Sequence, residues 1–183
     1  MERQEVVEIV KQHVTNKNLF KHCLAVEAIM EALAKHLCKD RRKWAMAGLV
    51  HDIDYDSTFD KPEKHSLEGG KMLKEMGFEQ DIVHAVEAHN EIHGIPRESM
   101  LDKALFSADP ISGLITACAL ILPSKKLSEI NASFVLRRMD EKLFAKGANR
   151  EHIRQCSEMG LSLEKFIEIS LKAMQEISDE LGL

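Results

Sequence analysis

Histidine is the most prominent potential ligand in this sequence, and it occurs beside carboxylates. Nine of the 183 residues are histidines, as many as the phenylalanines, tryptophan and tyrosine together. His51 and Asp52 are adjacent and follow Ala45–Val50, whose small or apolar residues are predicted to be buried. A buried, ionised aspartate is costly unless it is paired or binds a metal, and the neighbouring imidazole supplies a second ligand. The pair therefore predicts a metal site at the end of a helix.

The same dipeptide also has a purely structural interpretation. His51 could cap the carboxyl end of the helix while Asp52 begins an Asx turn, and for an isolated His-Asp pair this interpretation is the more common one. Four further residues of metal-ligand type favour the metal site. They are His22 in a predicted amphipathic helix, His65 beside Ser66, His89 at the end of another helix, and Asp109 just before Pro110.

Helices must position these residues, because apolar residues recur at helical spacing through nearly all of the chain. Val26, Met30, Leu33 and Leu37 show this spacing in one segment, and no convincing period-two strand is found. We therefore expect an all-α fold, in which residues 1–183 form a single-domain helical bundle of about eight helices.

Capping residues and helix breakers set the expected bounds of several helices. Asp40 is expected to cap a helix that runs to about Asp52, and Ser66 to cap one that ends at Gly77. Ser99–Asp102 resembles a capping box, and Pro110 and Pro123 stand on either side of a short apolar helix. Asn149 is expected to cap a helix that ends near Gly160. Ser162 is expected to cap the terminal helix Leu163–Leu181, which Gly182 closes.

Two predicted loops, Ile53–Pro62 and His89–Glu98, directly follow candidate ligands, and function is expected there. In the first loop, Asp54 and Asp56 could orient ligand imidazoles as carboxylate acceptors, or they could only solvate the loop. In the second loop, His93 could line the mouth of a substrate site. The remaining histidines are expected to be structural, as for His84, or exposed to solvent, as for His13, His36 and His152.

The order of these residues resembles the HD superfamily of metal-dependent phosphohydrolases, whose pattern is a first histidine, an HD dipeptide, further histidines and a late aspartate. The resemblance covers about Phe20 to Gly113 and extends to the contexts Ala47–Ile53 and Ala104–Asp109. It implies an HD-domain-like fold with a metal-binding core at about residues 20–113, on which helices within residues 114–183 pack.

The resemblance also implies roles for individual residues. His22 and His51 each bind a metal, Asp52 bridges, and Asp109 binds. His65 and His89 match the added ligands of a subset with two metals that includes bacterial diadenosine tetraphosphate hydrolases. We therefore expect one or two divalent transition metals, with two favoured. Mixed imidazole and carboxylate ligation suits iron, manganese, zinc, cobalt or nickel.

The sequence differs from the cyclic dinucleotide phosphodiesterases of this superfamily. Ile53–Tyr55 reads Ile-Asp-Tyr where that group has Ile-Gly-Lys, and the chain contains no Gly-Tyr-Pro tripeptide. Cyclic dinucleotides are therefore disfavoured as substrates.

The expected activity is that of a metal-dependent phosphohydrolase with His51 and Asp52 at its catalytic centre. A metal-activated hydroxide would cleave a phosphoester or phosphoanhydride bond of a nucleotide or other small phosphorylated metabolite. Two alternatives keep the fold. One is a diiron oxygenase, and the other is a non-catalytic module that binds a ligand or regulates a partner.

Substrate phosphates require positive charge close to the metal centre. Candidate residues for this role are Arg97, Lys125, Lys126, Arg137 and Arg138, although surface helices carry lysine and arginine in any case. The chain has 25 lysines and arginines against 30 aspartates and glutamates, a net charge of -5, without a basic run. This balance argues against a nucleic-acid polymer and favours a small phosphorylated substrate.

The longest apolar stretch, Leu114–Leu122, is far shorter than the ~20 residues that cross a bilayer, and Met1–Gln4 lacks a signal-peptide core. We therefore expect no membrane partner and a cytoplasmic location. A homodimer through apolar helices is compatible with the sequence. The four cysteines show no paired spacing, which indicates neither a disulfide framework nor a zinc knuckle.

Overall fold

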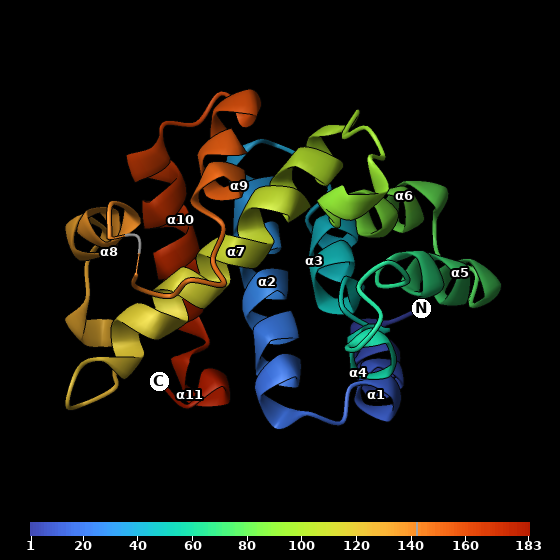
Figure 1. The fold of residues 1–183 in the computed structure, drawn as a ribbon, viewed down its shortest axis with the longest axis horizontal. Coiled ribbons are helices and arrows are strands. Elements are labelled where there is room, and N and C mark those ends of the chain that lie inside the picture. The colour runs from blue at the N-terminus through green and yellow to red at the C-terminus, as the bar shows by residue number, and fades with distance from the viewer. Residues whose placement is uncertain (142) are drawn as a thin grey trace.

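The computed structural model describes residues 1–141 and 143–183, and every regular element among them is a helix (Figure 1). Eight of the α-helices in these ranges have eight residues or more, so the predicted all-α bundle of about eight helices is confirmed. The α-helices are α1 Arg3–His13, α2 Lys17–His36, α3 Arg41–Val50, α4 Tyr55–Thr58, α5 Leu67–Glu75, α6 Gln80–Ala88, α7 Met100–Leu120, α8 Ala132–Met139, α9 Arg150–Arg154, α10 Leu163–Glu176 and α11 Ser178–Leu181. The 3₁₀ turns are η1 Glu91–His93, η2 Leu127–Glu129 and η3 Gln155–Met159.

Helix α7 crosses the middle of the molecule and packs on α2, α6, α9 and α10 (Figure 1). Its apolar side chains, Leu105, Phe106, Ile111, Leu114 and Ile115, are at most 1% exposed. Leu105, Ile111, Leu114 and Ile115 belong to a continuous buried cluster with members from α1 to α11. Burial of this apolar surface is the main force that fixes α7 against its neighbours.

The prediction that Pro110 begins a separate helix is wrong, because Pro110 lies inside α7. A proline in a helix interior removes one backbone hydrogen bond and costs ~3 kcal/mol. Leu105 before it and Ile111 and Leu114 after it are fully buried, and each contributes ~2 kcal/mol by its burial. Packing on both sides of Pro110 therefore outweighs the local preference.

Most predicted capping residues do cap helices. The side chain of Asp40 accepts from the Lys43 amide at 3.0 Å, and Ser99 and Asp102 form the expected capping box. Asn149 caps α9, and Ser162 caps α10. Helix α3 ends at Val50, two residues earlier than expected.

The terminal helix is not continuous, in contrast to the prediction. Its backbone breaks at Ile177, where the amide bonds to Met174 in a tighter turn, and α11 then runs to Leu181 before the left-handed Gly182 (φ +73°).

Ser66 does not cap α5, although the sequence suggested it. Its hydroxyl instead donates to the Glu87 carbonyl at 3.2 Å. The cap is Asp54, whose Oδ2 accepts from the amides of Ser66 and Gly69, both at 2.8 Å. A carboxylate from the preceding loop thus ties that loop to the start of α5.

Helices α2 and α3 approach each other closely at Gly48. A Cβ atom there would lie 2.8 Å from the Val26 carbonyl oxygen and 2.9 Å from the Glu27 Cα atom. Only glycine fits this approach, which brings the middle of α2 against the end of α3.

No helix within the described ranges is long and apolar enough to cross a membrane. The four cysteines are all free.

Candidate metal centre

The six predicted ligands come from five separate segments and meet in one place. His22 lies on α2, His51 and Asp52 directly follow α3, and Asp109 lies in α7. His65 lies just before α5 and His89 just after α6. His51 is fully buried, and Asp52 and His89 are 6% and 7% exposed, so the centre of the group is closed to solvent.

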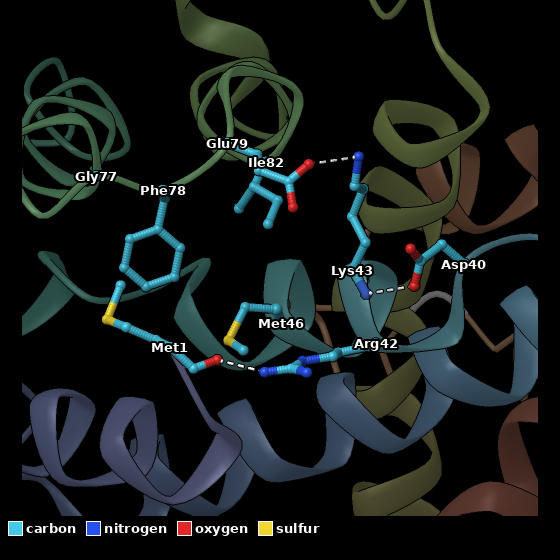
Figure 2. A pocket seen from close by; sticks show the side chains of 9 residues that line it. All are labelled: Met1, Asp40, Arg42, Lys43, Met46, Gly77, Phe78, Glu79 and Ile82. Atoms are coloured by element: carbon cyan, nitrogen blue, oxygen red, sulfur yellow. Dashed lines mark hydrogen bonds and ion pairs between the residues drawn. The ribbon is translucent and has the colours of Figure 1, made fainter.

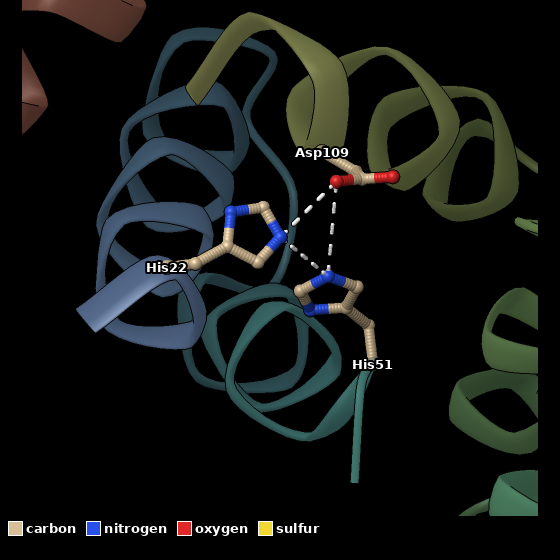
Figure 3. Close-up of side chains that lie close together, drawn as sticks. All are labelled: His22, His51 and Asp109. Carbon is tan, nitrogen blue, oxygen red and sulfur yellow. Dashed lines mark hydrogen bonds and ion pairs between the residues drawn. The ribbon is translucent and has the colours of Figure 1, made fainter. Parts of the chain in front are cut away.

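One half of the group is formed by His22, His51 and Asp109 (Figure 3). The Nε2 atom of His22 lies 3.1 Å from Nε2 of His51 and 3.1 Å from Oδ1 of Asp109. Oδ2 of Asp52 lies 3.6 Å from Nε2 of His22 and 3.4 Å from Nε2 of His51. Four ligand-type atoms therefore face a common point.

The other half lies on the opposite oxygen of Asp52. Its Oδ1 atom is 3.4 Å from Nε2 of His65 and 3.6 Å from Nε2 of His89. Ligand atoms of His51, Asp52 and His89 also lie within 4.8 Å of one another. Asp52 thus stands between two histidine pairs, with one carboxylate oxygen directed to each.

All four histidines are held in the same way, with Nδ1 bonded outward and Nε2 directed to the carboxylates. The acceptors are the Gly48 carbonyl for His51 at 2.8 Å, the Val86 carbonyl for His89, the Ser112 hydroxyl for His22 at 2.9 Å and Asp54 Oδ1 for His65 at 2.9 Å. Carbonyl and carboxylate oxygens only accept, so the proton lies on Nδ1. The Ser112 hydroxyl donates to the Asp109 carbonyl and so accepts from His22. Nε2 is therefore the nitrogen of each histidine that faces the carboxylates and that could offer a lone pair to a metal.

Burial and charge act in opposite directions on these groups. Burial lowers the pKa of His51 to about 4, which keeps this imidazole neutral. Burial alone would raise the pKa of Asp52, but the surrounding histidines, His51 first, hold it well below its usual range. The pKa of Asp109 is also lowered, because its bond to His22 outweighs burial. Both carboxylates are therefore ionised at neutral pH.

His65 and His22 hold a proton more strongly than an ordinary histidine. Burial disfavours their charged forms, but the carboxylates of Asp52 and Asp54 raise the pKa of His65 to about 10. Asp109, followed by Asp52, likewise raises the pKa of His22. Negative charge in this group thus attracts a positive charge, which a divalent cation would supply.

From the sequence, Asp54 and Asp56 could either orient ligand imidazoles or only solvate the loop. In the structure the two residues have different roles. Asp54 is 1% exposed and orients His65, the role of a carboxylate behind a metal ligand. Asp56 is not bonded to any of the four histidines. Its Oδ2 accepts from the amides of Thr15 at 2.6 Å and Asn16 at 3.1 Å, and this fixes the turn before α2.

The two predicted functional loops are joined beside His65. Asn90 Nδ2 donates to the carbonyls of Pro62 and His65, both at 3.2 Å. His93 Nε2 lies 2.7 Å from the same His65 carbonyl. The structure therefore places His93 next to the candidate centre.

Among the predicted phosphate-binding cations, Arg97 contacts a residue of α7 that is close in sequence to the ligand-type Asp109. Its guanidinium carbon is 3.8 Å from the centroid of the Phe106 ring, one helical turn before Asp109. Lys125 and Lys126 follow the far end of α7, ~16 Å along the helix from Asp109.

Arg137 and Arg138 lie on α8, on the other side of α7 and α10 from α3 (Figure 1). The Arg138 guanidinium is bonded to Glu141 at 2.6 Å. The structure therefore does not bring these two arginines, or Lys125 and Lys126, to the six ligand-type residues.

The other histidines are outside the group. His84 Nδ1 pairs with the buried Asp102 at 3.2 Å, which agrees with a structural role. His13 and His36 are exposed as expected. The expectation of an exposed His152 is wrong, because its ring lies 4.1 Å from the Phe106 centroid and its Nε2 bonds to Glu91 at 2.9 Å.

Three residues that contact the group were not predicted from the sequence: Ser112, Asn90 and Tyr55, whose ring centroid lies 5.1 Å from that of His65. Ser112 is a hydroxyl within the apolar part of α7, three residues after Asp109 and therefore on a neighbouring face, which is a detectable signal. The contacts of Asn90 and Tyr55 depend on how the two loops fold, and no local pattern reveals them.

A separate hollow lies between the start of the chain, α3 and the α5–α6 turn (Figure 2). Its charged groups pair with one another. Lys43 bonds to Glu79 and Asp81, both at 2.7 Å, and Arg42 donates to the Met1 carbonyl at 2.7 Å. This hollow has no histidine in its lining and offers no comparable ligand set.

Comparison with known proteins gives one family and one group of relatives. The HD domain family model matches residues 19–140. Ribonuclease Y of Nitratidesulfovibrio vulgaris (strain DP4) is 35% identical over 98 residues, which cover 54% of this chain and 18% of that protein. Ribonuclease Y of Oleidesulfovibrio alaskensis is 32% identical over 98 residues, with the same two shares, 54% and 18%.

Ribonuclease Y of Fusobacterium nucleatum is 29% identical over 122 residues, or 64% of this chain and 24% of that protein. The chain thus spans only 18% to 24% of the length of these relatives. No solved structure gives a significant match.

Proposed function

The chain belongs to the HD domain family, and from this premise we propose that it is a metal-dependent phosphohydrolase acting on a nucleotide or other small phosphorylated metabolite. The bond cleaved is a phosphoester or phosphoanhydride. The observation that carries the proposal is the convergence of four imidazole Nε2 atoms on the carboxylates of Asp52 and Asp109.

The residues present fit two divalent transition metals. His22, His51, Asp109 and Oδ2 of Asp52 would hold one of them. Oδ1 of Asp52, His65 and His89 would hold the other. This mixture of nitrogen and oxygen ligands suits iron, manganese, zinc, cobalt or nickel. When bound, such metals lower the pKa of a coordinated water and neutralise charge on a phosphoryl group.

The protein side chains contribute orientation, access and proton transfer. The Nδ1 bonds fix the orientation of the four imidazoles, so that each Nε2 faces the carboxylates. Asp109 has a side chain that is 36% exposed, so substrate approaches from its side of the group and not past the buried His51. Its second oxygen points away from His22 and His51 and can accept the proton of the attacking water (Figure 3).

Arg97 is the chain's best candidate for a phosphate contact. Its guanidinium stacks 3.8 Å from the ring of Phe106, which precedes Asp109 by three residues on α7, and this contact holds the guanidinium in place. A preorganised guanidinium loses less freedom when it binds phosphate, and it can make two parallel hydrogen bonds.

A second candidate function is cleavage of RNA phosphodiester bonds. It is favoured by the similarity of 54% of this chain to 18% of two proteins named Ribonuclease Y. The net charge of -5 disfavours it, because polymer binding depends on phosphate neutralisation by a positive surface.

The test is a phosphate-release screen of purified protein with Mn²⁺, Fe²⁺, Co²⁺ or Ni²⁺ over nucleotides and dinucleoside polyphosphates, with a short oligoribonucleotide in parallel. We expect release from one class of small substrate. Asp52→Asn should reduce turnover more than ~100-fold, because even residues behind metal ligands contribute 10–100-fold.

Asp81→Asn is the matched control, since Asp81 pairs with Lys43 on another face and should be dispensable. Cleavage of the oligoribonucleotide alone would support the second candidate. Full activity of Asp52→Asn with an unchanged helical spectrum would overturn both.

A further inference from the structure

Aromatic rings lead from the metal centre to the surface. The rings of His89 and His65 are 5.2 Å apart at their centroids, and the Tyr55 ring lies 5.1 Å from His65, edge to face at 85°. The Phe59 ring lies 6.0 Å from Tyr55 at 68°. The series begins at a residue that faces Asp52 and ends at Phe59.

Phe59 is the outermost ring, and the fold does not require it. It is 75% exposed, whereas Phe106 and Phe166 are at most 1% exposed. A phenylalanine at the surface forgoes most of the free energy that its burial would provide. Its ring face is therefore open to a further planar group.

The backbone around Phe59 is held in place. Asp54 bonds to the start of α5, and Asp56 bonds to the turn before α2. The amide of Lys61 donates to the Thr58 carbonyl at 2.7 Å. Phe59 is thus presented by a fixed segment beside the centre, and a ligand would not have to order that segment first.

We propose that Phe59, supported by Tyr55, stacks against the aromatic base of a nucleotide substrate, an inference that rests on the proposed function. Two ring-to-ring steps of 5.1 Å and 6.0 Å separate Phe59 from His65, comparable with the distance from base to terminal phosphate in one nucleoside diphosphate. The rings of Phe59 and His65 are no farther apart than the sum of these two steps, so a base on Phe59 would leave its phosphates within reach of the metal ligands.

The exposed aromatic ring of Phe59 suits a base better than an acyl chain or a sugar. Aromatic side chains stack with any base through its π face, and this preference tolerates different bases. The adjoining loop adds Ile92, 61% exposed, and Asn90 bonds that loop to Pro62. The loop that carries Phe59 is thus joined to a second loop that also exposes an apolar side chain.

Binding and turnover of Phe59→Ala test the proposal. The probe for binding is the diphosphate of 1,N⁶-ethenoadenosine, whose fluorescence is quenched on stacking, with Mn²⁺-loaded protein. We expect Phe59→Ala to weaken binding about tenfold and to abolish the quenching. Phe59→Trp should restore both. Ile121→Ala, which removes an apolar side chain that is 49% exposed at the far end of α7, is the matched control.

The kinetic comparison uses two substrates that differ only in the base. Phe59→Ala should raise KM about tenfold for adenosine diphosphate and leave hydrolysis of ribose 5-diphosphate unchanged. Equal effects on both substrates, or wild-type binding of the fluorescent probe by Phe59→Ala, would overturn the role of Phe59. If wild-type protein binds the probe through Phe59 but releases phosphate from neither substrate, the proposed hydrolase activity fails and the base site stands.

Discussion

Metal binding at this centre should depend on pH, because each histidine must lose any proton on Nε2 before it can bind a metal. Each histidine of the centre donates from Nδ1 and directs Nε2 to the carboxylates, but His51 and His65 differ in their affinity for protons. His51 is enclosed by helices α2 and α3, and burial lowers its pKa to about 4. His65 lies between two carboxylates that raise its pKa to about 10. Metal binding must therefore displace a proton from His65, whereas His51 is already in the ligand form.

Loss of stability in acid should report on His51 in the metal-free protein. The pKa of the unfolded residue is near 6.5, above the folded value of about 4, so only the unfolded state takes up this proton between these limits. The contribution of the neutral imidazole is thus complete above pH 6.5 and is lost as the pH falls toward 4.

Urea unfolding of metal-free protein at pH 7 and pH 4.5 measures this effect. Because His51→Gln cannot titrate at this position, its free energy of unfolding should fall about 2 to 3 kcal/mol less than that of wild type between the two pH values. An equal fall in both proteins would contradict the assigned protonation.

Packing of whole elements decides whether His22 and His51 meet. Helices α2 and α3 are in backbone contact at Gly48, three residues before His51. The Gly48 carbonyl also accepts from His51 Nδ1 at 2.8 Å. One glycine thus sets both the distance between two ligands and the orientation of one of them.

Gly48→Ala should therefore be destabilising and should weaken metal binding. Its Cβ atom would meet backbone atoms at 2.8–2.9 Å, and overpacking of this kind costs ~1–3 kcal/mol. Thermal unfolding and Mn²⁺ calorimetry measure the two effects.

Gly113→Ala is the matched control. It lies in α7, and apart from the adjacent backbone of that helix nothing lies within 4 Å of the added Cβ, so the substitution should gain ~0.5–1 kcal/mol of helix stability. Equal stability and Mn²⁺ affinity of both variants would contradict the role of Gly48.

At the same scale, the sequence predicted elements well where the signal was local. Asp40, Ser99, Asn149 and Ser162 cap helices because a cap depends on a side chain and an amide two or three residues away. The helix boundary predicted at Pro110 was wrong because α7 is kept continuous by the burial of its side chains against helices that are distant in sequence.

For two further residues, long-range contacts also decided the outcome. The predictions for Ser66 and His152 were wrong because the residues that they contact are remote in sequence. Ser66 bonds to Glu87 and Asp54. His152 contacts Phe106 and Glu91.

Over the whole molecule, the candidate site could be predicted from residue types and their order, but its geometry could not. The six ligand-type residues span His22 to Asp109, and only the packed bundle shows that Asp52 directs one oxygen to each histidine pair. Lys125 and Lys126 were plausible cations in the sequence and lie far along α7 in the fold. Long-range placement is thus the part that local patterns do not contain.

The central claim is that this chain holds two divalent metals through Asp52. The most direct test is the metal-to-protein ratio, measured by mass spectrometry after loading with Mn²⁺ and removal of free metal. We predict about two metals per chain for wild type and for the control His84→Ala, whose histidine pairs with Asp102 outside the centre. His65→Ala should retain about one, and Asp52→Asn should retain almost none. A wild-type protein without bound metal, or a ratio that Asp52→Asn leaves unchanged, would contradict the account.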